Sequence, residues 1–225
     1  PSGCTYIIAA TGKVLTFGDE FPNEPASGDV YITQDYKYFY EKSIYNSDST
    51  YIKTLEKWNV EVIDKTKSKY GEILSSIAGE PVKSMYYTFE SCTNLKTAPI
   101  IPSSVTDVEC TFMNCTSLEV ASIIPSSVTQ MSETFRGCTS LQTTPAIQNG
   151  VKYMIHTFEG CTGLKTVSEI PSSVTQLAGT FLGCTSLQTA PIIPDSVTDM
   201  SYAFYECTSL ETGPIIPNSV TSIDM

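Results

Sequence analysis

Eight cysteines are the residues of this 225-residue chain whose type first suggests chemistry. Thiols can form disulfides, bind zinc, or act as nucleophiles when a base lies within hydrogen-bond reach. Six of them recur every 23 residues, and these are Cys92, Cys115, Cys138, Cys161, Cys184 and Cys207. The other two, Cys4 and Cys110, do not follow this spacing.

The spacing argues against each kind of thiol chemistry. Side chains one period apart are expected to point the same way, whereas a disulfide needs Cβ vectors that converge. Zinc sites use closely paired cysteines, and in the closest pair here, Cys110 and Cys115, only Cys115 belongs to the repeating set. We therefore predict that the six repeating thiols are free, reduced and buried. Whether Cys4 and Cys110 bridge to one another stays open.

A catalytic Cys–His pair is not expected either. His156 is the only histidine, and it lies two repeats away from Cys110. Stacked strands lie ~4.8 Å apart, so the two side chains would be about 10 Å apart, too far for proton transfer. The carboxylate pairs Asp19–Glu20 and Asp107–Glu109 lack the oxygen spacing of a calcium loop and are read as solvated turns. We expect no catalytic residue, no cofactor and no metal.

Two further residue types keep the 23-residue step. A fixed period of this size indicates a solenoid, in which each repeat buries its apolar face by stacking on its neighbours. These residue types are phenylalanine and leucine, and with the six cysteines they form what we call the predicted core ladder. Its further members are Phe89, Phe112, Phe135, Phe158, Phe181 and Phe204, and Leu95, Leu118, Leu141, Leu164, Leu187 and Leu210.

The second repeat, VTDVECTFMNCTSLEVASIIPSS, shows the elements that must position these residues. Val105, Val108, Phe112 and Cys115 fall at offsets 0, 3, 7 and 10, the spacing of one helical face. Residues 118–123 then alternate less regularly, which indicates a short strand before a Pro-Ser-Ser turn. We predict a coil made of a short helix or helical turn, a corner, a short parallel strand and a proline turn.

The motif V-T-x-M-x-x-T-F-x-x-C-T-S-L-x-T-A-P-x-I-P-S-S resembles the leucine-rich repeats of bacterial BspA-type surface proteins. It recurs six times between Val82 and Met225, with the start of a seventh repeat at Val220. The family's repeat usually has one more residue before the phenylalanine and one fewer before the proline, which favours its shorter-helix subgroup. The resemblance implies a leucine-rich-repeat solenoid with a parallel β-sheet, in a surface-exposed, non-catalytic binding protein.

The first 81 residues do not repeat. Runs rich in Tyr, Val, Ile and Thr, punctuated by Gly-containing turns, predict short antiparallel strands. Residues 69–77, KYGEILSSI, are apolar at helical spacing and are followed by Gly79 and Pro81, so we expect a helix there. We predict a β-rich capping domain at 1–81, since terminal units of solenoids are atypical, and the solenoid at 82–225. A separate carbohydrate-binding or adhesion module is the alternative for 1–81.

Two surfaces compete as the binding site. The predicted strand presents a nearly uniform polar column from Lys96 to Glu211. The helical segment presents three outward columns in which seven of 18 positions are Tyr, Met, Ile or Leu, although free drift would deposit Lys, Glu and Ser. We expect contact there, through Tyr86, Tyr87, Met113, Arg136, Ile155, His156, Leu182, Tyr202 and Tyr205.

The overall charge limits the classes of binding partner that we expect. There are 24 acidic against 13 basic residues and no basic stripe, so nucleic acid is not an expected partner. No run of 18 apolar residues occurs, so no direct membrane insertion is expected. A protein partner is expected first and a glycan second, at a cell surface or in the extracellular space. A structural spacer, a phage tail-fibre segment, or a carbohydrate-binding module of a larger enzyme are the alternatives.

The chain itself reads as a piece of a longer protein. It begins at Pro1 without a visible signal sequence, and VTSIDM opens a seventh repeat and stops. Further repeats or an anchoring segment are therefore expected beyond it.

Overall fold

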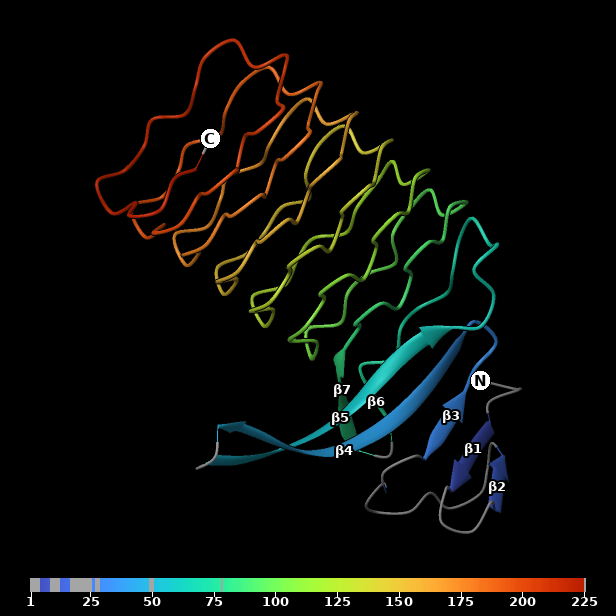
Figure 1. The fold of residues 1–225 in the computed structure, drawn as a ribbon. Coiled ribbons are helices and arrows are strands. Elements are labelled where there is room, and N and C mark those ends of the chain that lie inside the picture. Colours follow the sequence, from blue (N-terminus) through green and yellow to red (C-terminus); the bar gives the residue numbers. More distant parts are fainter. Residues whose placement is uncertain are drawn as a thin grey trace.

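The computed structural model describes residues 5–8, 13–16, 26, 29–48, 51–77 and 79–224, with the backbone alone for 5–8, 13–16, 41–48 and 51–56. Cys4 and the Asp19–Glu20 pair lie outside the described residues. The described chain forms a β-sheet followed by a column of stacked coils (Figure 1).

The sheet at the N-terminal side has seven strands in the order β2-β1-β3-β4-β5-β7-β6. All neighbours pair antiparallel except β5 and β7, which are parallel. The strands are β1 (Thr5–Ile8), β2 (Lys13–Thr16), β3 (Val30–Ile32), β4 (Tyr36–Asp48), β5 (Tyr51–Val62), β6 (Ser76–Ile77) and β7 (Glu80–Ser84). The region before the repeats is thus rich in β-strands, as its composition predicts.

None of the described residues forms a helix, so the predicted helix at 69–77 is wrong. Its apolar residues Tyr70, Ile73 and Ile77 are buried, which explains the helical spacing. Its backbone, however, bonds to the sheet region: the Gly71 amide donates to Asp35 and the Leu74 amide to the Tyr38 hydroxyl. A helix over 69–77 would have used the Leu74 amide internally, for the Tyr70 carbonyl, so its bond to Tyr38 competes with the helix.

The sheet runs without a break into the coils (Figure 1). β7 pairs with β5 on one side, and Ser84 at its end bridges Asp107 on the next coil. β7 also spans the predicted domain boundary at residues 81 and 82. One equivalent residue per coil continues this parallel ladder to the last coil, through Ser84, Asp107, Gln130, Tyr153, Gln176, Asp199 and Ser222.

The predicted helical segment of each coil is a run of tight turns. In coil 1 the amides of Met85, Tyr87 and Phe89 donate to carbonyls of the next coil, at 2.9, 3.3 and 2.8 Å. The intervening amides of Thr88 and Glu90 close turns onto residues three positions earlier. Three-residue turn closure places Val, Val or Met, Phe and Cys on one side, as a helix would. Because every second donor leaves for the neighbouring coil, no helix can form.

The predicted strand is less regular than the sequence suggests. On that side of the coil, bridges join Thr97 with Val120, Thr143 with Thr166, and Thr189 with Thr212. These link coils 1 and 2, 3 and 4, and 5 and 6, and a further bridge between Ile124 and Ile147 links coils 2 and 3. The ladder that includes an equivalent residue of every coil lies at the Val-Thr-x segment. The more continuous sheet is therefore not the one expected from the sequence.

The core ladder confirms the main prediction. Its members are buried, apart from the half-buried Phe204 and Leu210 in the last full coil. Successive phenylalanine rings stack with centroids 5.2 to 5.8 Å apart. Beside them, buried threonines bond across coils, as when the Thr157 hydroxyl donates to the Met131 carbonyl at 2.9 Å. Each coil is thus fixed to its neighbour by both apolar and polar contacts.

Replacing a central ring of this stack should be costly. Phe158→Ala is expected to lower the free energy of unfolding by about 3 to 5 kcal/mol, because it leaves a cavity between two stacked rings. Urea denaturation followed by circular dichroism measures this. Phe204→Ala is the matched control, and since Phe204 is only half-buried the loss should be clearly smaller. Equal losses would contradict the stacked core.

The ladder cysteines are free and buried, as predicted. Each from Cys115 onward donates its thiol to the phenylalanine carbonyl of the preceding coil, for example Cys161 to Phe135 at 3.0 Å. Burial raises the pKa of Cys115 and of Cys161 to about 12. These thiols are protonated at neutral pH and act as structural hydrogen-bond donors.

Alkaline pH should destabilise the fold through these thiols. Above about pH 8.5 the unfolded chain loses thiol protons that the folded chain keeps, so the free energy of unfolding falls by up to about 1.4 kcal/mol per pH unit for each thiol. The fall continues up to the folded pKa near 12, and below pH 8 this contribution is constant. Urea unfolding at pH 8, 9 and 10 measures the slope.

Cys161→Ser isolates the thiol contribution from that of other alkaline groups. Serine keeps a donor for the Phe135 carbonyl but does not titrate in this range. The variant should show a shallower alkaline slope than the parent chain. Identical slopes would show that the ladder thiols do not govern the pH dependence.

Candidate functional site

The nine residues predicted to bind all lie on the run of turns between the Val-Thr-x ladder and the cysteines. We call this surface the turn strip and define it as residues 86, 87 and 90 of coil 1 with their equivalents at every 23 residues. Tyrosines mark both of its ends. Tyr86 and Tyr87 in coil 1 are 46% and 41% exposed, and Tyr202 and Tyr205 in coil 6 are 47% and 49% exposed.

The tyrosines are organised in pairs. The rings of Tyr86 and Tyr87 lie edge to face with centroids 4.3 Å apart, and those of Tyr202 and Tyr205 do so at 6.2 Å. Hydrogen bonding to Tyr86 and to Cys110 raises the pKa of Tyr87. Four coils separate the pairs, so the structure does not bring them together into one cluster.

The middle of the strip is more buried and more polar. Arg136 is exposed and bridges two coils, with 3.0 Å contacts to Glu133 on its own coil and Glu159 on the next. His156 Nδ1 lies 2.9 Å from the same Glu159 carboxylate. Met113, Ile155, His156 and Leu182 are half-buried. The predicted residues thus lie on equivalent turns of successive coils, with the exposed aromatic groups in the first and last of these coils.

Cys110 corrects the prediction that its whole column faces outward. It is only 2% exposed, and burial raises the pKa of its thiol to about 11. The Tyr87 side chain of the preceding coil hydrogen-bonds with it. A thiol that is buried and protonated in this way is a poor nucleophile.

Two positions in every coil have a left-handed backbone, which the sequence does not reveal. One is the column of Asn114, Gly137 and Gly160, where residues that tolerate positive φ are common. The other runs through the turn strip, with φ between 52° and 60° at Tyr87, Cys110, Glu133, His156, Gly179 and Tyr202. Only one of those six is glycine, although glycine adopts this conformation without strain. Strained residues of this kind concentrate at functional sites.

Gly179 shows what the strip requires locally. A Cβ atom at this position would lie against the imidazole ring of His156 on the preceding coil. The glycine therefore gives His156 the space to lie across coil 5 while its Nδ1 contacts Glu159.

Backbone strain at Tyr202 generates a stability test. Tyr202→Gly should leave the free energy of unfolding unchanged or raise it by up to about 1 kcal/mol, because glycine relieves the left-handed strain. Tyr205 is equally exposed but has no positive φ, so Tyr205→Gly should lower it by about 0.5 to 1 kcal/mol. Urea denaturation of both variants checks the difference. A larger loss for Tyr202→Gly would show that its side chain serves stability.

A second exposed surface was missed by the sequence reasoning. In the I-I-P segments of coils 1, 2 and 5 the second isoleucine packs inward and the first faces solvent, whereas in coil 6 the second, Ile216, is also 48% exposed. We call the outward positions the isoleucine column. It contains Ile100, Ile123, Ile192 and Ile215, which are 76%, 60%, 91% and 90% exposed. The signal was available, because consecutive side chains of an extended segment point to opposite faces and only one of two adjacent isoleucines can be buried.

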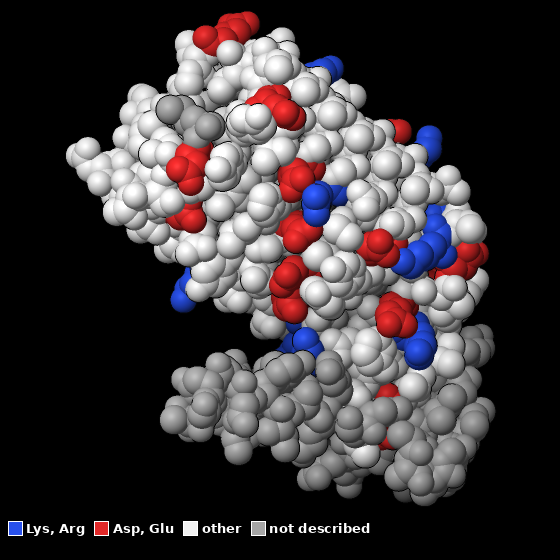
Figure 2. Space-filling model, in the orientation of Figure 1, with Lys and Arg blue, Asp and Glu red and all other residues white. Residues whose placement is uncertain are grey.

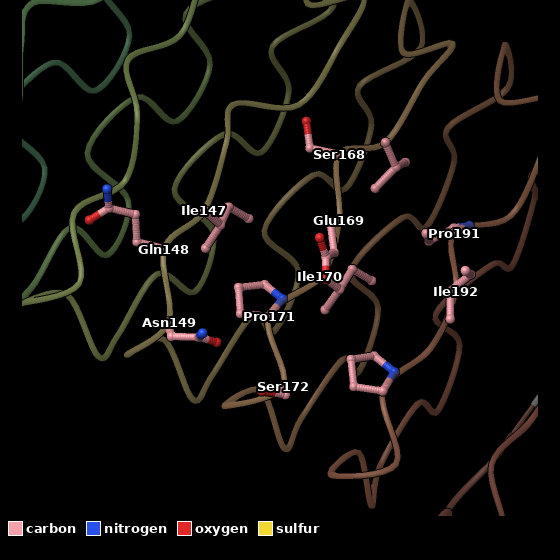
Figure 3. A pocket seen from close by; sticks show the side chains of 12 residues that line it. Ile147, Gln148, Asn149, Ser168, Glu169, Ile170, Pro171, Ser172, Pro191 and Ile192 are labelled. Atoms are coloured by element: carbon pink, nitrogen blue, oxygen red, sulfur yellow. The ribbon is translucent and has the colours of Figure 1, made fainter.

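A groove opens beside this column between coils 3, 4 and 5 (Figure 3). It has a volume of about 870 Å³, within the range of ligand-binding clefts. Ser168, Glu169, Ile170 and Pro171 lie in its middle, between Ile147–Asn149 on one side and Pro191–Ile192 on the other (Figure 3). We call it the inter-coil groove.

Charged side chains are sparse over much of the face that Figure 2 shows. In Figure 2, acidic and basic groups follow one another along the coils, and most of the remaining surface is uncharged. The residues that the structure describes hold no cluster of three or more His, Cys, Asp or Glu that could bind a metal ion. Among the same residues no helix is long and apolar enough to cross a membrane.

The coil geometry agrees with the family comparison. The repeats match the family described as "BspA type Leucine rich repeat region" over residues 76–187 and 146–225, in six copies. The match covers more than half of the sequence, so the chain belongs to this family of leucine-rich-repeat proteins. No curated protein matches the sequence significantly.

Solved structures of bacterial leucine-rich-repeat proteins share the fold. A T. pallidum leucine-rich-repeat protein is 24% identical with a TM-score of 0.62, over 74% of this chain and 78% of its own. One from Eubacterium ventriosum is 28% identical with a TM-score of 0.58, over 73% of this chain and 46% of its own. One from Bacteroides ovatus is 22% identical with a TM-score of 0.51, over 86% and 55%. This chain therefore spans about half the length of the latter two.

Proposed function

We propose that this chain is a non-catalytic binding module that recognises a macromolecule at a bacterial cell surface. The observation that carries the proposal is the occupancy of the left-handed column of the turn strip. Tyr87, His156 and Tyr202 stand there in a strained conformation, and both tyrosines are exposed rather than packed. Selection for stability alone would favour glycine at these positions. A binding role accounts for the large side chains.

The size of the strip favours a macromolecular ligand. The two tyrosine pairs are five coil steps apart, or roughly 24 Å at ~4.8 Å per step. Solenoids present extended surfaces of this kind, and binding energy concentrates in a few aromatic anchors. A protein is the preferred partner and a glycan the second. The family relationship and the sequence similarity to bacterial leucine-rich-repeat proteins support this class of function.

The chemistry of the cysteines and the histidine supports a non-catalytic role. The ladder thiols are buried and donate to backbone carbonyls. His156 is engaged with Glu159, and Cys110 is buried beneath Tyr87. None of these contacts supplies a nucleophile with a base beside it.

We also propose that residues 1–81 cap the first coil. Val60 in β5 accepts a 2.7 Å hydrogen bond from the Thr88 hydroxyl, as Met85 does from Thr111 one coil later. The rings of Tyr36 and Tyr70 pack edge-on against Phe89 at 6.1 and 5.1 Å. β5 and the Tyr70 segment thereby occupy the place of a preceding coil. Covering the apolar end of a solenoid is the usual role of a terminal unit.

A partner is first identified by pull-down from surface preparations or on a glycan array. The role of the turn strip in binding that partner is then tested by a double substitution. Tyr202→Ala with Tyr205→Ala should weaken binding by about 2 kcal/mol or more if these residues are anchors. Isothermal titration calorimetry measures the change. Gln142→Ala and Lys165→Glu on the opposite polar column are the controls and should change binding little.

The opposite effects of these variants would contradict the proposal that the turn strip is the binding site. If the tyrosine variant binds normally while Lys165→Glu abolishes binding, contact uses the polar column. If neither preparation yields a partner, a spacer role is favoured. Tight binding of a small metabolite in a closed pocket would contradict the proposed function as a whole.

A further inference from the structure

The inter-coil groove contains backbone donors that no coil uses. Within the described residues, the amides of Glu169, Ile170, Ile192 and Ile193 donate no hydrogen bond. The equivalent segments of coils 2 and 3 are joined: the Ile124 amide donates to Ala146 at 2.9 Å, and the Gln148 amide returns to Ile124 at 3.0 Å. The same segment of the repeat can therefore pair with an extended neighbour, whereas in coils 4 and 5, as at Ile100 and Ile101 in coil 1, its amides have no partner among the described residues.

The local sequence keeps these segments extended. Ile170 precedes Pro171 and Ile193 precedes Pro194. Steric clash with the proline ring disfavours the helical region for the residue before it, so both isoleucines are biased toward β or polyproline conformations. An extended backbone with open donors is the template that β-strand addition uses.

The lining of the groove indicates which side chains would suit it. Ile147 is half-buried, Ile192 projects at the rim, and Pro171 and Pro191 add apolar surface. Glu169 is the one charged residue of the lining, and it forms no ion pair with any described residue. Gln148, Asn149, Ser168 and Ser172 make the rest of the lining polar but uncharged. A single exposed carboxylate among apolar and uncharged polar groups complements a single cationic side chain flanked by apolar ones.

We propose that the inter-coil groove binds an extended peptide segment of a partner protein, with a lysine or arginine facing Glu169 and apolar residues against Ile147 and Ile192. The peptide backbone pairs with the groove segment as the segment of coil 3 at Ala146 to Gln148 pairs with Ile124 of coil 2. The site is separate from the turn strip and does not depend on the function proposed for it.

Two synthetic hexapeptides test the site on the whole chain, one alternating valine with lysine and the other alternating valine with glutamate. Fluorescence anisotropy of the labelled peptides gives the affinities. The lysine peptide should bind at least tenfold more tightly than the glutamate peptide. Amide hydrogen exchange should show protection at one amide of each adjacent pair, Glu169 or Ile170 and Ile192 or Ile193, when the lysine peptide is bound, because consecutive amides of an extended segment point to opposite edges.

Three variants locate the contact. Glu169→Lys and Ile192→Ser should each weaken the lysine peptide at least tenfold, and both residues are exposed, so the fold should persist. Ile100→Ser is the matched control, because it removes an isoleucine of the same column in coil 1, outside the groove. It should leave affinity unchanged, as should the Tyr202 and Tyr205 double substitution. Circular dichroism and urea midpoints verify folding.

The proposal is overturned by any of three results. The first is equal affinity for the lysine and glutamate peptides, or binding of neither. The second is a loss on Ile100→Ser as large as that on Ile192→Ser. The third is binding that leaves the four groove amides exchanging as in the free protein.

Discussion

The structure depends on one pattern of backbone hydrogen bonds. In the turn segment of each coil, every second amide donates to the next coil, and the amides between them close turns within their own coil. This pattern satisfies the backbone while making each coil need a neighbour. It also requires left-handed residues at two positions of the repeat, which are found from coil 1 to coil 6. The phenylalanine stack, the threonine bonds and the thiol bonds all follow, because equivalent residues are placed one above another.

The same pattern explains the use of cysteine. The phenylalanine carbonyl of each coil faces the thiol of the next, at 3.0 to 3.2 Å. Serine would bring a stronger donor but a more polar side chain, whereas cysteine packs as a small apolar group with a weak donor. Burial raises the pKa of these thiols and keeps them protonated. Cysteine in this chain is a packing residue.

Some surface positions of the repeat keep similar residue types from coil to coil, and others vary. The polar column and the threonines beside it vary little, since they cover the strand side of each coil. The turn strip carries aromatic and charged residues on a strained backbone, and the isoleucine column keeps large apolar groups in solvent. Neither the four tyrosines of the strip nor the outward isoleucines are buried in the core of their own coil. The two surfaces lie on different segments of the repeat.

The sequence by itself determined the period, the solenoid and the buried columns, because only side chains that meet their equivalents in the next coil must keep a fixed type. Phe158, Cys161 and Leu164 could be assigned to the core for this reason. It also predicted strands before the repeats and the exposure of the four tyrosines.

The tertiary structure decided those features of backbone conformation and side-chain burial that depend on hydrogen bonds between distant segments. The 0, 3, 7, 10 spacing fits a helix and a run of three-residue turns equally well, and the amides that leave for the next coil select the turns. For residues 69–77 the choice was made by Asp35 and Tyr38, more than 30 positions away. Cys110 is buried and hydrogen-bonds with Tyr87 of another coil, a contact that its place in the repeat does not indicate. Whether an amide before the proline turn is paired, as at Ile124, or unpaired among the described residues, as at Ile170 and Ile193, is likewise decided between coils, because the local sequences are similar.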